Sequence, residues 1–215
     1  MTGPLDAMAN NSIAACRLYG FIDTGYLAGR SPAELTRALI AGGVDIIQVR
    51  AKELLHAHRV ELALAVIGVA FRAGVPVIVN DDLDAAVESG ADGVHLGQED
   101  WATTSRDRLA SVRIVGISTH SLEQALQAER NGANYIGVGP VFATGTKPNV
   151  APVGIKLVKQ VAAKLAVPFF AIGGITLQNV AQVKAAGATR IAVVSGILQA
   201  PDVAKAAQQF KDKLV

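Results

Sequence analysis

A glycine-led motif repeats four times along the chain, and it constrains the fold more than any other feature. The four copies read GVDIIQV, GADGVHL, GANYIGV and GATRIAV, and they begin at Gly43, Gly90, Gly132 and Gly187. Each glycine follows a stretch with helical spacing, where a left-handed residue can end a helix without a Cβ penalty. A strand-like run begins two or three residues later. The motif therefore predicts a helix that leads directly into a strand.

Strand-like runs alternate with helical spacing over the whole length of the chain. The runs lie near 18–22, 44–50, 76–80, 93–97, 113–118, 134–139, 168–172 and 190–195, and the helical stretches include 32–41, 57–73, 122–131 and 153–165. Such alternation predicts a parallel sheet, and eight repeats favour a closed (β/α)8 TIM barrel over an open doubly wound sheet. We expect one α/β domain over residues 16–215, after a short N-terminal tail at 1–15.

The repeated motif also predicts which side chains face the barrel interior, because side chains alternate across a strand. The wholly apolar set should pack on the helices, and it comprises Ile47, Val49, Val94, Leu96, Ile136, Val138, Ile191 and Val193. The mixed set should point inward, and it comprises Gln48, Arg50, His95, Gly97, Gly137, Gly139, Ala192 and Val194. Active sites of such barrels lie at the C-terminal ends of the strands. Gln48, Arg50 and His95 are therefore candidate site residues.

Composition excludes several classes of protein. The 215 residues are 51% hydrophobic, and 20 basic residues face 18 acidic ones, which gives a net charge of +2. This is too apolar for a disordered chain, and the scattered basic residues argue against a nucleic-acid-coating surface. The longest apolar run, 62–71, has about half the length of a membrane-spanning helix. With no export signal and a single cysteine, Cys16, we expect a soluble protein of the reducing cytoplasm.

Cationic side chains follow the second strand in the sequence QVRAK. Arg50 offers a fork of donors and Lys52 a point charge, a pair suited to phosphate oxygens. An arginine paired with a carboxylate for structural reasons fits this short motif equally well.

Carboxylates follow the third and fourth strands. Asn80 and Asp81 end the third strand, and Asp100 comes just after the fourth. Neighbouring strands would bring Asp81 and Asp100 together above the barrel. Two carboxylates without a histidine or cysteine cluster favour a hard cation, above all Mg²⁺. The alternative is that both residues cap helices, as Asp82 or Asp84 also could.

Three further segments lie where strands five to eight end. In GISTHS, Ser118 ends a strand, Ser121 with Gln124 makes a capping box, and the role of His120 stays open. The long loop at 139–152 has the length of a functional lid. The glycines of AIGGI and VVSGI let backbone N–H groups approach an anion, at the usual phosphate position of such barrels, although they also suit tight turns alone.

Seven motifs together resemble the thiamine-phosphate synthase family. They are QVRAK, VNDD, ADGVHLGQED, GISTHS, YIGVGPVFATGTK, AIGGIT and AVVSGI, in family order over about residues 19–199. The resemblance implies a (β/α)8 enzyme, a transferase that joins hydroxymethylpyrimidine diphosphate to the nitrogen of thiazole phosphate. Pyrophosphate would leave in a dissociative step with Mg²⁺ bound.

The resemblance also implies roles for the matching residues. The pyrimidine diphosphate would be held by Gln48, Arg50, Lys52, Asn80, Ser118 and Lys147, with His95 and Gly97 lining the pyrimidine pocket. Asp81 and Asp100 would bind Mg²⁺. The thiazole phosphate would be held by Thr144, Thr146, Gly174, Val194 and Ser195. The chain departs from the family pattern at Ala143, where proline is more usual, and in the order of Asp23 and Thr24.

Two other functions suit the same barrel. A thiazole tautomerase would need the thiazole phosphate site and an acid/base residue, for which His120 is the candidate, but not the carboxylates or the cationic cluster. A non-catalytic barrel could bind thiamine intermediates and regulate a partner, and a degraded diphosphate or metal site would favour it. The intact charged residues favour the synthase. We expect small-molecule partners, no nucleic acid or membrane, and we leave a homo-oligomer open.

Overall fold

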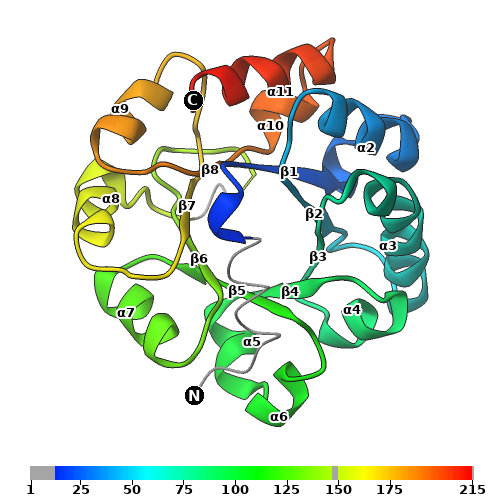
Figure 1. Cartoon of the computed structure of the whole chain (residues 1–215), viewed down its shortest axis with the longest axis horizontal. Helices are drawn as coiled ribbons and strands as arrows, with labels where there is room; N and C mark the ends of the chain where they lie inside the picture. The colour runs from blue at the N-terminus through cyan, green and yellow to red at the C-terminus, as the bar shows by residue number, and fades with distance from the viewer. Residues whose placement is uncertain (1–12, 147–149, 215) are drawn as a thin grey trace.

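Eight parallel strands close into a barrel in the structure, a computed structural model that describes residues 13–146 and 150–214. Each strand pairs with the next along the chain, and β8 pairs with β1 (Figure 1). The strands are β1 (Leu18–Asp23), β2 (Ile46–Arg50), β3 (Val77–Asn80), β4 (Gly93–Leu96), β5 (Ile114–Thr119), β6 (Tyr135–Val138), β7 (Phe169–Ile172) and β8 (Ile191–Ala192). The predicted (β/α)8 barrel is confirmed.

The helices form a ring around this barrel (Figure 1). They are η1 (Thr24–Tyr26), α2 (Pro32–Ala41), α3 (His56–Ala70), η2 (Phe71–Ala73), α4 (Leu83–Ser89), α5 (Gln98–Thr103), α6 (Arg106–Leu109), α7 (Leu122–Arg130), α8 (Gly154–Ala162), α9 (Val180–Ala185), α10 (Ser195–Leu198) and α11 (Val203–Asp212). The four predicted helical stretches correspond to α2, α3 with η2, α7 and α8. The short α10 follows β8 almost at once.

The four repeated glycines have the left-handed backbone that the motif predicts. Their φ angles are 81° at Gly43, 69° at Gly90, 89° at Gly132 and 98° at Gly187. A residue with a Cβ is strained in this region, so glycine lets each helix end and the chain turn into the next strand.

Two apolar layers share the strands, and they confirm the predicted alternation. The outer layer lies between strands and helices and holds the apolar set, including Ile47, Val94 and Ile136. The inner layer holds Tyr19 and Ala192 with other inward side chains. Strand β8 is shorter than the predicted 190–195, because Val194 (φ −102°, ψ −86°) turns the chain out of the ladder into α10.

The segment before β1 enters the barrel interior. Residues 13–15 are helical, and Figure 1 shows this blue turn within the ring of strands. Ile13 is fully buried in the inner layer, beside Cys16. The boundary between a tail at 1–15 and a domain at 16–215 stays a prediction. In the described part of the chain, no helix combines the length and apolarity that a membrane span requires.

Candidate active site

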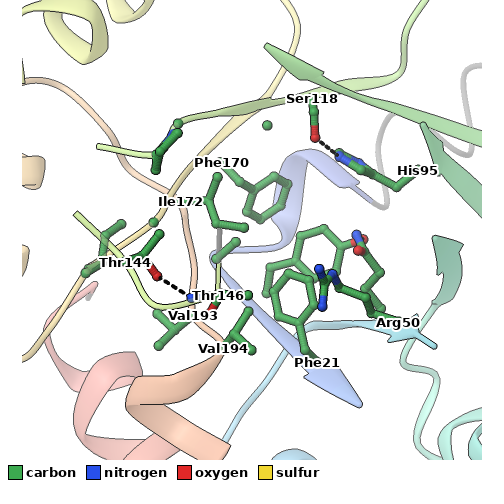
Figure 2. A pocket seen from close by; sticks show the side chains of 18 of the residues that line it. Phe21, Arg50, His95, Ser118, Thr144, Thr146, Phe170, Ile172, Val193 and Val194 are labelled. Atoms are coloured by element: carbon green, nitrogen blue, oxygen red, sulfur yellow. Dashed lines mark hydrogen bonds between the residues drawn. The ribbon is translucent and has the colours of Figure 1, made fainter. Parts of the chain in front are cut away.

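A pocket opens where the strands end, and all eight strands of the barrel contribute residues to its lining. Of the predicted site residues, those that line it are Gln48, Arg50, Asn80, His95, Ser118, Thr144, Thr146, Val194 and Ser195. Figure 2 shows Arg50, His95 and Ser118 on one side and Thr144, Val193 and Val194 on the other. Lys52, Asp81, Gly97, Asp100 and Gly174 are not among the lining residues, and Lys147 lies outside the described residues.

Arg50, at the end of β2, is held by a buried carboxylate. Its Nη1 lies 2.6 Å from Oδ2 of Asp23, which is 1% exposed. The other oxygen of Asp23 accepts the Gly25 N–H at 2.9 Å and so caps η1. Arg50 therefore pairs with a carboxylate, as the structural alternative predicted. A guanidinium has five N–H donors, so further donors remain for a ligand at the pocket.

Asp81 and Asp100 lie close enough to influence each other, as predicted. Asp81 has a left-handed backbone, with φ of 61°, and its N–H donates to the His95 carbonyl at 2.9 Å. Burial, then repulsion from Asp81 and Glu99, raises the pKa of Asp100, and nearby Lys52 opposes this effect. Lys52 Nζ lies 3.8 Å from Asp81 Oδ2.

The capping alternative holds for some of these carboxylates. Asp82 caps α4 by accepting the Ala85 N–H at 2.9 Å. Asp100, in the first turn of α5, also accepts the backbone N–H of Gly97, which is the N-cap of that helix. Asp100 therefore holds the start of α5 and still faces Asp81.

A two-carboxylate site fits Mg²⁺ in its donor chemistry. Among the described residues, no group of three or more His, Cys, Asp or Glu side chains gathers into a ready metal cluster. Mg²⁺ commonly binds one or two carboxylates and keeps water and substrate phosphates as its other ligands. Asp81 and Asp100, whose mutual repulsion a cation would relieve, match this pattern.

The far side of the pocket is built from backbone turns after β7 and β8. Gly173 and Gly174 have φ angles of 97° and 65°. A Cβ on Gly174 would lie 2.5 Å from the Ala143 carbonyl oxygen, so the turn packs closely on the long loop. Ser195 begins α10, and the first N–H groups of a helix lack intrahelical partners.

The long loop is hydrogen-bonded to η1, the short helix after β1. Tyr26 in η1 shares a 2.9 Å hydrogen bond with Thr146, and Thr144 Oγ1 accepts the Thr146 N–H at 3.3 Å (Figure 2). These contacts position two predicted ligand residues at the pocket. Lid motion of this loop stays a prediction.

His120 lies at the pocket wall next to the predicted capping box. Ser121 Oγ accepts the Gln124 N–H at 3.1 Å, and Gln124 Oε1 accepts the His120 N–H at 2.7 Å. His120 Nδ1 contacts the Gly139 carbonyl oxygen. Ser121 is confirmed as the N-cap of α7, but Gln124 reaches back to the N–H of His120, one residue before the cap, and His120 is held against backbone.

Two tyrosines on the pocket floor were missed by the sequence reasoning. Tyr19 and Tyr135 are buried in the inner layer and share a 2.8 Å hydrogen bond between their hydroxyls. Tyr135 lies two residues before the inward-facing Gly137, so the strand alternation could have placed it inside. Tyr19 lies outside the repeated motif and offered no such signal.

Ion pairs among charged side chains join α3 to α4. The ring of His56 contacts Glu88 Oε2 at 2.9 Å and Asp82 Oδ2 at 3.1 Å, and Arg59 reaches Asp82 at 3.0 Å. Hydrogen bonds to Glu88 and then to Asp82 raise the pKa of His56. These ion pairs hold the side chain of Asp82, the residue after Asp81 in the sequence.

Comparisons with known proteins agree with this geometry. The family model described as thiamine monophosphate synthase matches residues 18–197. The thiamine-phosphate synthase of Chloroflexus aurantiacus is 44% identical over 91% of both chains, and that of Halalkalibacterium halodurans is 43% identical over 90% of this chain and 93% of its own.

Solved structures give the same result. Thiamine phosphate pyrophosphorylase from Pyrococcus furiosus superposes with a TM-score of 0.84 at 30% identity, over 95% of this chain and 96% of its own. A 3-hexulose-6-phosphate synthase, at 22% identity and a TM-score of 0.68 over 93% of this chain and 100% of its own, shares the fold. The chain therefore belongs to the thiamine-phosphate synthase family, whose members are transferases.

Proposed function

We propose that the protein transfers the hydroxymethylpyrimidine group from its diphosphate to the nitrogen of thiazole phosphate, giving thiamine phosphate and pyrophosphate. One observation carries the proposal: the pocket has Arg50 with the polar side chains of Asn80 and Ser118 on one side, and on the other the long loop and the turn after β8, with Thr144, Val194 and Ser195. Two anionic substrates need two such regions.

The ionic side suits the diphosphate, whose charge grows as it leaves. Arg50, Lys52, Asn80 and Ser118 supply donors there, and family resemblance adds Lys147. Asp81 and Asp100 would hold Mg²⁺, which supplies charge neutralisation to the leaving diphosphate. Donors fixed in advance around a developing charge are typically the largest catalytic contribution.

The middle of the pocket suits a flat heteroaromatic ring. Gln48 and His95 present amide and imidazole groups there, and Gly137 leaves space beside the His95 ring, since a Cβ would lie 3.3 Å from its Cε1. Gly97 adjoins this region at the start of α5. We assign the pyrimidine to this position.

The backbone side suits a phosphate that stays intact. Gly174, Val194 and Ser195 belong to the turns after β7 and β8, and Thr144 and Thr146 add hydroxyls from the long loop. Neutral donors hold an anion without a large change of charge during the reaction.

The chemistry then needs few acid/base groups. The bond between the pyrimidine methylene carbon and the diphosphate oxygen breaks, and the electron pair leaves with pyrophosphate. The thiazole nitrogen attacks the electron-poor carbon. Stabilising the leaving group is the main requirement, which fits a site rich in fixed donors.

Two further parts of the proposal concern the cell and the assembly. A lone buried cysteine, Cys16, suits the reducing cytoplasm.

Helix α3 exposes Leu64 (51%) and η2 exposes Phe71 (82%), with Glu61 and Arg72 beside them. We propose a homo-oligomer that covers these exposed apolar side chains, and sedimentation of wild type against Leu64→Lys tests it: a monomeric wild type refutes it.

One assay separates the synthase from its rivals. Purified protein receives the pyrimidine diphosphate and thiazole phosphate, with Mg²⁺ or with a chelator. Magnesium-dependent thiamine phosphate formation with matching pyrophosphate release supports the synthase. Turnover of thiazole phosphate alone supports the tautomerase, and binding without turnover supports the regulator.

A further inference from the structure

A chain of four hydrogen bonds crosses the barrel beneath the pocket. Gln48 Nε2 donates to the Tyr19 hydroxyl at 2.9 Å, and the hydroxyls of Tyr19 and Tyr135 lie 2.8 Å apart. Tyr135 Oη lies 2.9 Å from His95 Nδ1, and His95 Nε2 lies 2.9 Å from Ser118 Oγ. Figure 2 shows the last of these bonds, at the pocket wall. Five strands thus contribute to one continuous polar chain.

Burial keeps the hydroxyls of both tyrosines in this row of hydrogen bonds protonated. Tyr19 is 2% exposed and Tyr135 is fully buried, and burial raises the pKa of both hydroxyls. Each hydroxyl is therefore neutral at physiological pH and has one proton to donate. Because each hydroxyl can donate only once, the hydrogen bonds from Gln48 to Ser118 should all be donated in the same direction.

The amide of Gln48 sets that direction. With Gln48 Nε2 donating to the Tyr19 hydroxyl, the arrangement that uses every donor sends the Tyr19 proton to Tyr135 and the Tyr135 proton to His95 Nδ1. In a neutral imidazole whose Nδ1 accepts, the proton is on Nε2. Nε2–H then donates to Ser118 Oγ, and the serine proton is left to point at a ligand.

A glycine on β5 makes room for the Tyr135 ring. A Cβ on Gly116 of β5 would lie 2.1 Å from Cζ and 2.4 Å from the hydroxyl oxygen of Tyr135. The Tyr135 ring also packs edge-on against Phe170, with centroids 5.6 Å apart. The Tyr135 ring is therefore packed between Gly116 and Phe170.

We propose that Tyr135 is a positioning residue whose hydroxyl keeps His95 in the Nε2–H tautomer, so that Ser118 donates its proton to an anionic substrate oxygen. In the opposite tautomer Nε2 would accept the serine proton, and Ser118 would present only lone pairs to the anion. The final step, donation to the diphosphate, rests on the proposed function. The tautomer itself does not.

The first test reads the tautomer in the free protein. Nitrogen-15 spectra of histidine-labelled protein, assigned with a His95→Gln variant, should show His95 protonated at Nε2. Tyr135→Phe keeps the ring and removes the hydroxyl, and it should shift His95 toward a mixture of tautomers. A wild-type His95 protonated at Nδ1, or an unchanged tautomer in Tyr135→Phe, overturns the proposal. Should Tyr135→Phe fail to fold, the wild-type spectrum still decides.

The second test uses kinetics. Tyr135→Phe should lower kcat by about ten-fold while the KM for thiazole phosphate stays within about two-fold. In a Ser118→Ala background the same change should have little further effect, because the donor it positions is gone. Equal losses in both backgrounds overturn the proposal. Ser89→Ala, which removes a buried hydroxyl bonded to the Ala85 carbonyl at 2.6 Å in α4, is the control that should leave kcat unchanged. A correct tautomer in a protein without synthase activity would refute the proposed function alone.

Discussion

The Asp23–Arg50 pair allows a quantitative test of how the ionic side of the pocket is held. In Asp23→Asn the amide oxygen can still accept the Gly25 N–H, but Arg50 loses its carboxylate. Removing one partner of a buried pair typically costs about 3–5 kcal/mol. Here the side chain of Asp23 is 2% exposed but that of Arg50 is 15% exposed at an open pocket, so water can hydrate the freed guanidinium. We therefore expect a loss of about 2–3 kcal/mol in the free energy of unfolding.

Denaturant unfolding of wild type and Asp23→Asn, followed by circular dichroism, measures this difference. The matched control is Asp84→Asn, because Asp84 pairs with Arg108 at the surface, where the side chains are 72% and 55% exposed. The control should change stability by less than about 1 kcal/mol. Equal effects of the two changes would show that burial of the Asp23–Arg50 pair does not govern its contribution.

Four other changes test separate parts of the structure. Gly116→Ala places a Cβ against Tyr135, so we expect a loss of about 3 kcal/mol or failure to fold, measured by thermal unfolding; near wild-type stability would contradict the packing. Ile13→Ala should cost about 2–4 kcal/mol in the same assay if residue 13 is part of the folded barrel, and no loss would mean that it is not. Asp100→Ala should lower turnover at least about 100-fold without unfolding the protein, and turnover near wild type would remove its assignment. The raised pKa of His56 means that its stabilising contacts are complete below its ordinary pKa and fade as pH rises through the raised value; the stability difference between wild type and a His56→Gln variant should therefore be larger at about pH 5.5 than at about pH 8.5.

The sequence predicted most of the fold because local backbone chemistry repeats along it. The glycine motif identified four helix-to-strand junctions, and strand alternation separated inner from outer side chains. The extent of β8 was not predicted, because the apolar run continues through Val193 and Val194 while the backbone already leaves the strand conformation at Val194.

The candidate site was predictable where residues end strands, as with Asn80 and Asp81. It was not predictable where partners lie far apart in the sequence. The Asp23–Arg50 pair spans 27 residues and follows from the register of β1 on β2, and the Tyr19–Tyr135 contact spans 116 and crosses the barrel interior, so neither can be read from local sequence. The motif QVRAK alone left Arg50 ambiguous between structure and ligand binding, and the structure shows how one guanidinium can serve Asp23 and still border the pocket.

Metal-dependent product formation tests the central claim most directly. Purified protein with both substrates is assayed for thiamine phosphate and pyrophosphate, first with Mg²⁺ and then with the ion removed by a chelator. The two products should appear in equal amounts with Mg²⁺, fall to background with the chelator and return when Mg²⁺ is restored. Product formation that persists without the ion would contradict the role of Asp81 and Asp100, and absence of thiamine phosphate under all conditions would contradict the proposed reaction.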